Sequence, residues 1–391
     1  MLTADVVIVG GGIMGTAVAH ALAVAGFDGS VVIVERDPSY REASTGRSAG
    51  GVRLQFSTPE NIRMSAVTVD LLENLKSVFG ADADVAFRGH GYLILASAEG
   101  HPVLLENAAI QRADGAATQI LGPSELARRF PWLATDGIAA GAFGGPAEGW
   151  LDPASLHGLF RQSALASGCR QINGTVQAIG LFGPDEAAVE LREGIRIDCS
   201  KVVNAAGAWA GRVAAAAELE LPVEPRKRFV FVLECRDAPE SLRRAPLTVD
   251  PSGVYFRPEG RYFICGLSPG ENEEPIDLDL DAIDHSWFED RIWPVLAARV
   301  PAFEAVKVAS AWAGYYDVNT LDHNAIIGPH PDHSNMLFIN GFSGHGIQQA
   351  AAAGRAIAEH IMHGRTVSLD LTRFGYDRIR DGRPVRERNV I

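Results

Sequence analysis

The chain has 391 residues, a formal net charge of −13 at pH 7 and a sequence pI near 5.3. Because broad contact with phosphate groups needs a positive surface, this acidic balance disfavours nucleic acid and anionic membranes as general partners. Hydrophobic residues make up 47% and charged residues 21% of the chain, which is typical of a folded α/β protein and excludes a largely disordered one.

The cysteines and the hydropathy bear on the compartment. Cys169, Cys199, Cys235 and Cys265 are far apart and show no metal-ligand spacing, which predicts neither a disulfide framework nor a metal site. No apolar run reaches the roughly 18 residues that a membrane-spanning helix needs. We therefore expect a cytoplasmic protein without a transmembrane segment. The locally basic tail, residues 373–388, is expected to be a solvated end.

The first predicted elements form a βαβ unit, with a strand over residues 5–9, a glycine turn, a helix over 13–25 and a strand over 30–34. Apolar spacing then predicts a helix over 59–79 and a strand over 87–96. Asp152 and Pro153 are typical of a helix start, because Asp accepts from free N–H groups and Pro suits the first turn.

The second half continues this alternation. We expect strands over 201–204, 229–234, 253–256, 262–266 and 337–340, a helix over 281–298 and a closing helix over 347–361. Nucleotide-type βα units thus recur at both ends and in the middle. The predicted fold class is α/β, with a Rossmann-like nucleotide-binding domain (1–80, 146–222 and 309–391) into which a β-sheet-rich substrate domain (81–145 and 223–308) is inserted discontinuously.

A glycine motif connects the first strand to the first helix. The run Gly10-Gly11-Gly12-Ile13-Met14-Gly15 fits GxGxxG in the context that a dinucleotide site requires. Gly10 permits the tight turn, Gly12 lets the backbone approach a pyrophosphate, and Gly15 lets the helix pack closely on the strand.

Other groups of the same unit complete the fingerprint. The N–H groups of Ile13 and Met14 are free at the helix N-terminus, where phosphate is favoured. Glu35 ends the next strand and is placed to accept hydrogen bonds from ribose hydroxyls, and its charge disfavours the 2′-phosphate of NADP. This unit by itself does not distinguish NAD from FAD.

Three further motifs carry a family resemblance. They are Ser-Thr-Gly-Arg-Ser-Ala-Gly-Gly over 44–51, Asn-Ala-Ala-Gly-Ala-Trp over 204–209 and Gly-Phe-Ser-Gly-His-Gly-Ile over 341–347. With them the chain resembles the D-amino-acid oxidase superfamily, in particular its sarcosine oxidase, glycine oxidase and D-amino-acid dehydrogenase branch. The resemblance covers nearly the whole length, keeps the family order, and implies FAD rather than NAD.

The resemblance also implies the cofactor contacts. It places Arg36 beside Glu35 near the adenosine, Val176 on the adenine, and residues 44–50 along the pyrophosphate, the ribityl chain and the ring. A Ser/Thr/Gly loop with an arginine offers phosphate both backbone N–H groups and a forked donor. Beyond the fingerprint, the expected cofactor residues are Arg36, Ser44, Thr45, Arg47, Ser48, Ala49, Gly50, Val176, Ala206, Gly207, Gly314, Gly344, His345, Gly346 and Ile347.

The last motif stands directly before the closing helix. Its N–H groups and the helix dipole would stabilise the negative charge that a reduced flavin carries at N1 and at the C2 carbonyl oxygen. We expect His345 to be held by its backbone rather than to act as a base.

In this family an arginine holds the substrate carboxylate while hydride passes to flavin N5. Arg53 matches the arginine that sarcosine oxidases place after the flavin loop, with a surface ion pair as the alternative. Glycine and D-amino-acid oxidases place theirs two residues after Trp-x-Gly, where this chain has Tyr316. Arg228 is a second candidate that resembles D-arginine dehydrogenase, and Tyr255 matches a substrate-side tyrosine or packs in a strand.

Two absences concern the flavin. No cysteine follows Cys265, although monomeric sarcosine oxidases attach flavin through one beyond Trp-x-Gly, and residues 262–266 lack the lysine that activates oxygen in those enzymes. We therefore expect noncovalent FAD and a dehydrogenase rather than an oxidase, with oxygen, a quinone or a carrier protein as the electron acceptor.

The predicted function is oxidation of the C–N bond of an amino acid or N-substituted amino acid to an imine, which water then hydrolyses. One alternative is an FAD enzyme of the same fold that acts on a 2-hydroxy acid. Another is a noncatalytic flavoprotein, because residues 342–349 also resemble a mitochondrial FAD-domain assembly factor for respiratory complex I.

Overall fold

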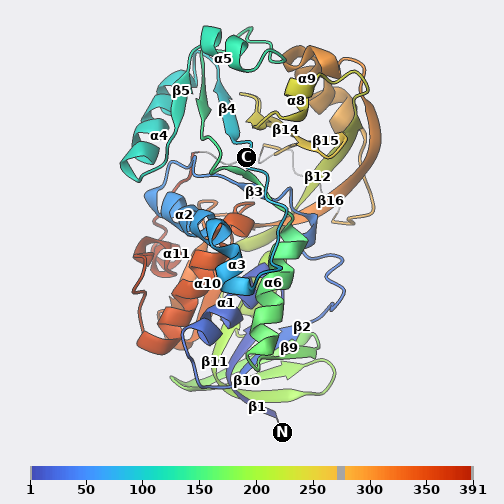
Figure 1. Ribbon diagram of the computed structural model, residues 1–391. Coiled ribbons are helices and arrows are strands. Elements are labelled where there is room, and N and C mark those ends of the chain that lie inside the picture. The colour runs from blue at the N-terminus through green and yellow to red at the C-terminus, as the bar shows by residue number, and fades with distance from the viewer. Residues whose placement is uncertain (1, 271–277, 389–391) are drawn as a thin grey trace.

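The computed structural model describes residues 2–270 and 278–388. Two eight-stranded sheets lie at opposite ends of the molecule, and the long strands β12 and β16 run from the upper sheet toward the lower one (Figure 1). In the described part of the chain, no helix is both long enough and apolar enough to cross a bilayer.

The lower sheet has a parallel core. Its order is β17-β18-β11-β1-β2-β8, with β17 antiparallel at the edge. The strand β10 pairs antiparallel with β11, and β9 pairs antiparallel with β10. The core strands are nearly continuous apolar runs because parallel strands are covered on both faces. The bounds are β1 (Leu2–Val9), β2 (Val31–Glu35), β8 (Arg170–Asn173), β9 (Val176–Gly183), β10 (Glu186–Leu191), β11 (Arg196–Asn204), β17 (Ile326–His330) and β18 (His333–Asn340).

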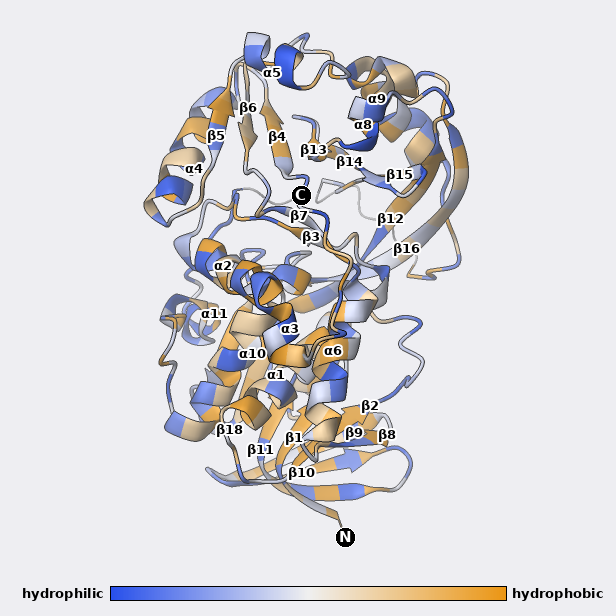
Figure 2. Cartoon of the chain, in the orientation of Figure 1, coloured by the Kyte–Doolittle hydropathy of each residue, from blue (hydrophilic) through white to orange (hydrophobic). Residues whose placement is uncertain are grey.

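A group of helices covers one face of this sheet. The helix α1 (Ile13–Val24) packs against both α6 (Pro153–Ala166) and α10 (Gly346–His363), and α10 also packs against α2 (Pro59–Glu73). Figure 2 shows hydrophobic residues concentrated along β1, β2 and β11, beneath these helices. Asp152 caps α6 as predicted, since its carboxylate accepts a hydrogen bond from Ser155 N at 3.0 Å.

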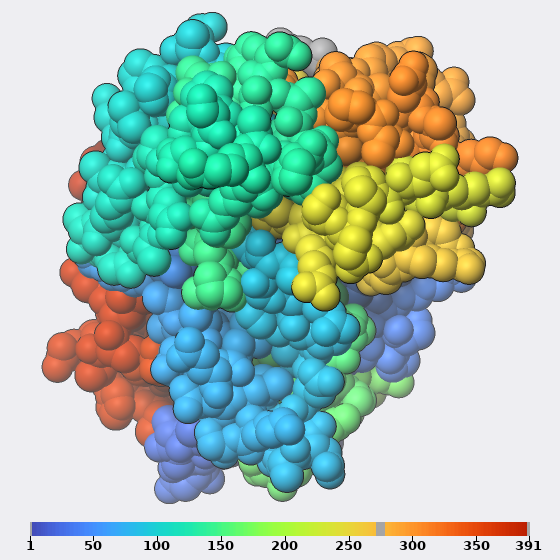
Figure 3. Space-filling view, turned by 45° about the horizontal axis from the view of Figure 1, so that its top comes forward, coloured from blue at the N-terminus to red at the C-terminus, as the bar shows by residue number. Residues whose placement is uncertain are grey.

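The upper sheet is antiparallel except where β13 pairs with β4. Its order is β16-β12-β15-β14-β13-β4-β6-β5, and its two portions, far apart in sequence, lie side by side at one end of the molecule (Figure 3). The bounds are β4 (Tyr92–Ala96), β5 (Gln119–Leu121), β6 (Ala140–Phe143), β12 (Val223–Glu234), β13 (Leu247–Val249), β14 (Val254–Glu259), β15 (Tyr262–Leu267) and β16 (Lys307–Asn319).

The remaining elements lie between the strands and main helices or after α10. They are η1 (Thr45–Arg47), β3 (Gly51–Val52), α3 (Leu75–Phe79), α4 (His101–Ala113), α5 (Pro123–Arg129), β7 (Gly149–Trp150), η2 (Gly207–Trp209), α7 (Ala210–Ala215), α8 (Glu240–Arg243), η4 (Trp287–Ile292), α9 (Trp293–Arg299), η5 (Pro301–Phe303), η6 (Thr372–Phe374) and α11 (Asp377–Arg380). A parallel Rossmann-like sheet combined with an antiparallel sheet confirms the predicted fold class.

Two predicted helices differ from the structure. The helix expected over 59–79 is divided into α2 and α3 at Asn74, whose φ of −106° and ψ of 14° leave the helical range. The helix expected over 281–298 begins later, with a π-helical turn over Trp287–Ile292 followed by α9. Before it, the Asp284 carboxylate accepts from Ser286 N at 3.0 Å, a local bond that competes with helix formation.

The expectation of a solvated tail is wrong for its key side chains. Arg378 is 4% exposed and pairs with Asp322 at 2.7 Å. Glu387 is 7% exposed and accepts from Ser57 N and Thr58 N, at the start of α2. The tail is packed because its charges have partners far away in sequence, which local charge patterning does not reveal.

Candidate functional site

The carboxyl ends of β1 and β11 meet where the strand order of the lower sheet reverses. In open α/β sheets this switch point is where ligands bind. The chain leaves β1 through Gly10, which has φ +107°, and a Cβ there would overlap the carbonyl oxygen of Ala205 beyond β11. A Cβ on Gly15 would overlap the carbonyl oxygen of Gly10, whereas one on Gly12 would meet only Thr45 Oγ1, at 3.6 Å. Gly12 is therefore open to a close approach from the cavity, as predicted for a pyrophosphate.

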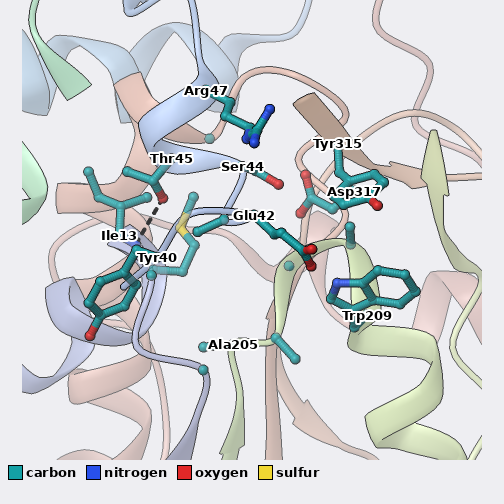
Figure 4. Close-up of a pocket in the computed structure, with 18 of the residues that line it drawn as sticks. Ile13, Tyr40, Glu42, Ser44, Thr45, Arg47, Ala205, Trp209, Tyr315 and Asp317 are labelled. Atoms are coloured by element: carbon teal, nitrogen blue, oxygen red, sulfur yellow. Dashed lines mark hydrogen bonds between the residues drawn. The ribbon is translucent and has the colours of Figure 1, made fainter. Parts of the chain in front are cut away.

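A cavity of about 390 Å³ opens at this point (Figure 4). Its volume lies within the usual range for ligand sites, and its walls come from both sheets. Gly15, Gly50 and His345 are not among the lining residues, but most of the predicted cofactor residues are: Gly10, Gly12, Ile13, Met14, Glu35, Arg36, Ser44, Thr45, Arg47, Ser48, Ala49, Val176, Ala206, Gly207, Gly314, Gly344, Gly346 and Ile347.

Glu35 supports the glycine turn. One carboxylate oxygen accepts from Gly11 N at 2.7 Å and the other accepts from Asp37 N at 2.8 Å. The side chain is thereby fixed at the cavity wall between the turn and the residues after β2. Its contact with a ribose stays a prediction.

The 44–51 loop is tied to both the glycine turn and the upper sheet. Thr45 Oγ1 accepts from Ile13 N at 3.2 Å, the bond drawn in Figure 4. The prediction that the Ile13 N–H group is free is therefore wrong, because a side chain 32 residues later in the sequence binds it. Arg47 donates through Nε to Arg41 O and through Nη1 to Ala313 O, both at 2.7 Å. Arg47 therefore anchors the loop to β16, and its predicted contact with phosphate stays a prediction.

Arg257 was missed by sequence reasoning, although it holds the same loop. Its Nε and Nη2 donate to Ala49 O at 3.1 and 2.8 Å, and its guanidinium lies 5.0 Å from the Trp150 ring centroid. It also pairs with Glu259. The signal in the sequence was its position two residues after Tyr255, which puts both on one face of β14.

Arg228, Tyr255 and Tyr316 line one part of the cavity together. Arg228 on β12 is opposite Gly314 on β16, and its guanidinium lies 5.2 Å from the ring centroid of Tyr316. The Tyr316 ring packs against Gly344, where a Cβ would overlap it. In glycine and D-amino-acid oxidases the carboxylate-binding arginine is expected at the position that Tyr316 occupies here. The neighbouring strand β12 thus supplies an arginine, Arg228, beside that position.

Arg53 lies elsewhere. It is 2% exposed and is not among the described residues that line the cavity. Its Nη1 donates to Gln55 O at 2.8 Å, and its guanidinium lies 4.2 Å from the Phe56 ring centroid. Burial lowers the pKa of Arg53, while Tyr92, Glu387, Glu148 and Tyr316 oppose this shift. Arg53 is therefore a buried guanidinium held by neighbouring protein groups, and the alternative of a surface ion pair does not describe it.

His345 is buried, with its ring 5.1 Å from that of Phe56. Burial and the neighbouring Arg53 lower the pKa of His345 well below its ordinary value, so the imidazole is neutral at neutral pH. His345 is not among the described residues that line the cavity, and its role toward the cofactor stays a prediction.

Other lining residues were not predicted. The Trp209 ring is near two guanidiniums, that of Arg36 at 4.8 Å and that of Arg212 at 4.3 Å from its centroid, and the centroid is 5.5 Å from that of the Tyr315 ring. Tyr40, Glu42 and Asp317 also face the cavity (Figure 4). Trp209 is the last residue of the 204–209 motif, and so its place was the most accessible to sequence reasoning.

Glu148 is a buried carboxylate near Arg53. It is 1% exposed and accepts from Leu54 N at 2.9 Å and from Gln55 Nε2 at 2.8 Å. Burial raises the pKa of Glu148 to about 7, although the bonds from Gln55 and Leu54 and the Arg53 charge favour the ionised form.

This pKa predicts a pH-dependent stability. Between pH 4.5 and about 7 the folded state binds more protons than the unfolded state, so the free energy of unfolding falls as pH rises through that window. Glu148→Gln removes the titrating group, so the fall in the free energy of unfolding over this pH window should become smaller by about 1–3 kcal/mol. Thermal unfolding at pH 5 and pH 8 measures it, with the exposed Glu99→Gln as control. An unchanged pH dependence in Glu148→Gln would contradict the assignment.

The comparisons with known proteins agree with this geometry. Residues 5–360 match the family described as FAD dependent oxidoreductase. FAD-dependent oxidoreductase domain-containing protein 1 from Xenopus laevis is 42% identical, over 99% of this chain and 85% of that protein. The chain belongs to the family of FAD-dependent oxidoreductases. Mitochondrial sarcosine dehydrogenase from Mus musculus is a more distant member, 27% identical over 99% of this chain but 43% of its own length.

Solved structures of this family share the fold. The L-proline dehydrogenase from P. horikoshii has a TM-score of 0.86 and 26% identity, covering 98% of this chain and all of its own. Glycine oxidase from Geobacillus kaustophilus has a TM-score of 0.78 at 21% identity, covering 96% of this chain and 98% of its own, and shows the fold alone. The residues present fit the FAD that membership implies, because Gly12 is open to the cavity and α10 begins at the cavity without a side-chain cap.

Proposed function

We propose that this FAD-dependent oxidoreductase oxidises the C–N bond of an amino acid or N-substituted amino acid. The substrate loses a hydride from carbon and a proton from nitrogen and becomes an imine, which water hydrolyses to a carbonyl compound and an amine. FAD, when bound, accepts the hydride, and an external acceptor such as oxygen, a quinone or a carrier protein later removes the electrons.

The observation that carries this proposal is the arginine in the cavity, Arg228, stacked on Tyr316 near Tyr255. A guanidinium binds both oxygens of a carboxylate in one plane and so fixes the substrate carbon as well. We assign the carboxylate to Arg228 rather than to Arg53, because Arg228 lines the cavity, whereas Arg53 is buried and is not among the described residues that line it.

The two tyrosines would act as neutral donors. Burial raises the pKa of Tyr316, which Arg228 and Arg53 partly offset, and burial together with the nearby Tyr316 raises that of Tyr255. Both hydroxyls therefore keep their protons at neutral pH and can donate to a substrate carboxylate, while neither serves as a base.

Relatives support a C–N substrate class. Sarcosine dehydrogenase and L-proline dehydrogenase are both named for amino acids with a secondary amine. Noncovalent FAD is part of the proposal, because Cys265, the last cysteine in sequence, is buried in the upper sheet and burial raises the pKa of its thiol. We also propose a cytoplasmic location, which the four unpaired cysteines favour.

Anaerobic mixing tests the substrate class. The purified yellow protein is mixed with sarcosine, L-proline, D-amino acids and 2-hydroxy acids while the visible flavin band is followed. We expect at least one amino acid to bleach the band within seconds and 2-hydroxy acids to leave it unchanged. Bleaching by 2-hydroxy acids alone would move the function to C–O oxidation. A band that no compound bleaches, but that dithionite does, would favour a noncatalytic flavoprotein.

A further inference from the structure

Asp317 lines the cavity next to Tyr316, and no predicted role accounts for it. Figure 4 shows its carboxylate among the side chains around the cavity, which Ser44 and Tyr315 also line. One oxygen of this carboxylate, Oδ2, accepts from Gly341 N at 2.9 Å and from Phe342 N at 3.1 Å. The main-chain oxygen of Asp317 accepts from Ser343 N at 3.2 Å. Three successive N–H groups of the loop before α10 therefore bind to a single residue.

The loop needs this support. Gly341, Ser343 and Gly344 have φ values of 74°, 51° and 96°, and the left-handed conformation is costly for Ser343, which carries a Cβ. Asn319, on the same strand as Asp317, adds a fourth bond by donating from its N to Ser343 Oγ at 3.1 Å. The strand β16 thus determines how the chain enters α10, whose first residues, Gly346 and Ile347, line the cavity.

The negative charge of the same carboxylate also bears on the reduction of a flavin bound in the cavity. Reduction adds negative charge to a bound flavin, which the N-terminus of α10 favours and an ionised carboxylate opposes. Burial raises the pKa of Asp317 to about 6, while the N–H groups that it accepts favour ionisation, so the group is mostly negative at neutral pH.

We propose that Asp317 is a positioning residue that holds the 341–344 loop at the cavity and that its negative charge lowers the reduction potential of the bound FAD. This rests on the cofactor site of the proposed function but not on its substrate. The side chain has two separate effects, since its acceptor oxygen fixes the loop and its charge changes the reduction potential of the bound FAD.

Two substitutions in the holoprotein distinguish these effects. Asp317→Asn keeps an acceptor oxygen for Gly341 and Phe342 but removes the charge, whereas Asp317→Ala removes both. The readouts are the FAD dissociation constant and the midpoint potential from a dye-equilibrated spectral titration, neither of which involves an amino acid substrate. Glu42→Gln is the matched control, because Glu42 is another carboxylate of the cavity wall and pairs with Arg36.

For Asp317→Asn we expect oxidised FAD to bind within about threefold of the unsubstituted protein. We expect reduced FAD to bind about tenfold more tightly relative to oxidised FAD, which raises the two-electron midpoint potential by about 30 mV. Asp317→Ala should weaken oxidised FAD binding at least tenfold, because the loop loses its acceptor. Glu42→Gln should shift the potential by less than half as much as Asp317→Asn.

An unchanged potential in Asp317→Asn would overturn the role of the charge. Equal loss of FAD in the Asn and Ala variants would overturn the role of the acceptor oxygen. A shift in Glu42→Gln as large as that in Asp317→Asn would mean that any carboxylate of the wall has this effect, and it would overturn the assignment to Asp317. Failure of every tested amino acid to reduce the flavin would leave these two readouts intact, and so the two proposals fail separately.

Discussion

Arg228→Ala is expected to lower kcat/KM for the amino acid substrate at least about thirtyfold while the protein keeps its FAD. Removing one partner of a buried, hydrogen-bonded charge pair costs about 2–5 kcal/mol, and losing the planar fork also leaves the reacting carbon free to move. We therefore expect kcat to fall and KM to rise. Arg228→Lys should recover part of the loss, because an ammonium supplies the charge without the fork. Steady-state kinetics with the substrate found by flavin bleaching measures the effect.

Arg53→Ala is the matched comparison for Arg228→Ala. Arg53 is stacked on Phe56 and bonded to Gln55 O, so its loss should lower the melting temperature more than the turnover of the protein that remains folded. If Arg53→Ala abolishes turnover in folded, FAD-bound protein while Arg228→Ala turns over normally, the carboxylate anchor belongs to Arg53. The family pattern seen in the sequence would then outweigh the cavity geometry.

Gly15→Ala is expected to weaken FAD binding at least about tenfold. The added Cβ would overlap the carbonyl oxygen of Gly10, a backbone atom that cannot turn aside, so the turn and α1 must separate. Overpacking of this kind costs about 1–3 kcal/mol, and here the strain falls on the N–H groups that would meet the pyrophosphate. The measurement is the FAD dissociation constant of the reconstituted apoprotein.

Gly158→Ala provides the control for Gly15→Ala. Gly158 lies within α6 with no heavy atom inside 4 Å of the added Cβ, and alanine favours a helix interior. This variant should bind FAD normally and melt at the same or a higher temperature. If Gly15→Ala binds FAD as tightly as Gly158→Ala does, FAD binding does not depend on close packing between the glycine turn and α1.

The sequence by itself determined the features that depend on local spacing. The glycine run after an apolar strand, with Glu35 ending the next strand, specified the turn and its open Gly12. Most predicted cofactor residues line the cavity because they lie on turns and loops at strand ends, and the carboxyl ends of parallel strands share one edge of the sheet.

Only the tertiary structure decided what depends on partners far apart in the chain. The burial of Arg53, the stacking of Arg228 on Tyr316 and the hold of Asp317 on the 341–344 loop each join segments whose pairing no local pattern specifies. The packed tail shows the same limit, since Glu387 accepts from the start of α2 more than 300 residues earlier. Removing a charge from water costs free energy, and only neighbouring polar or charged groups offset that cost. The complete fold assembles those groups, and so it decides whether a charged residue is solvated, paired or buried.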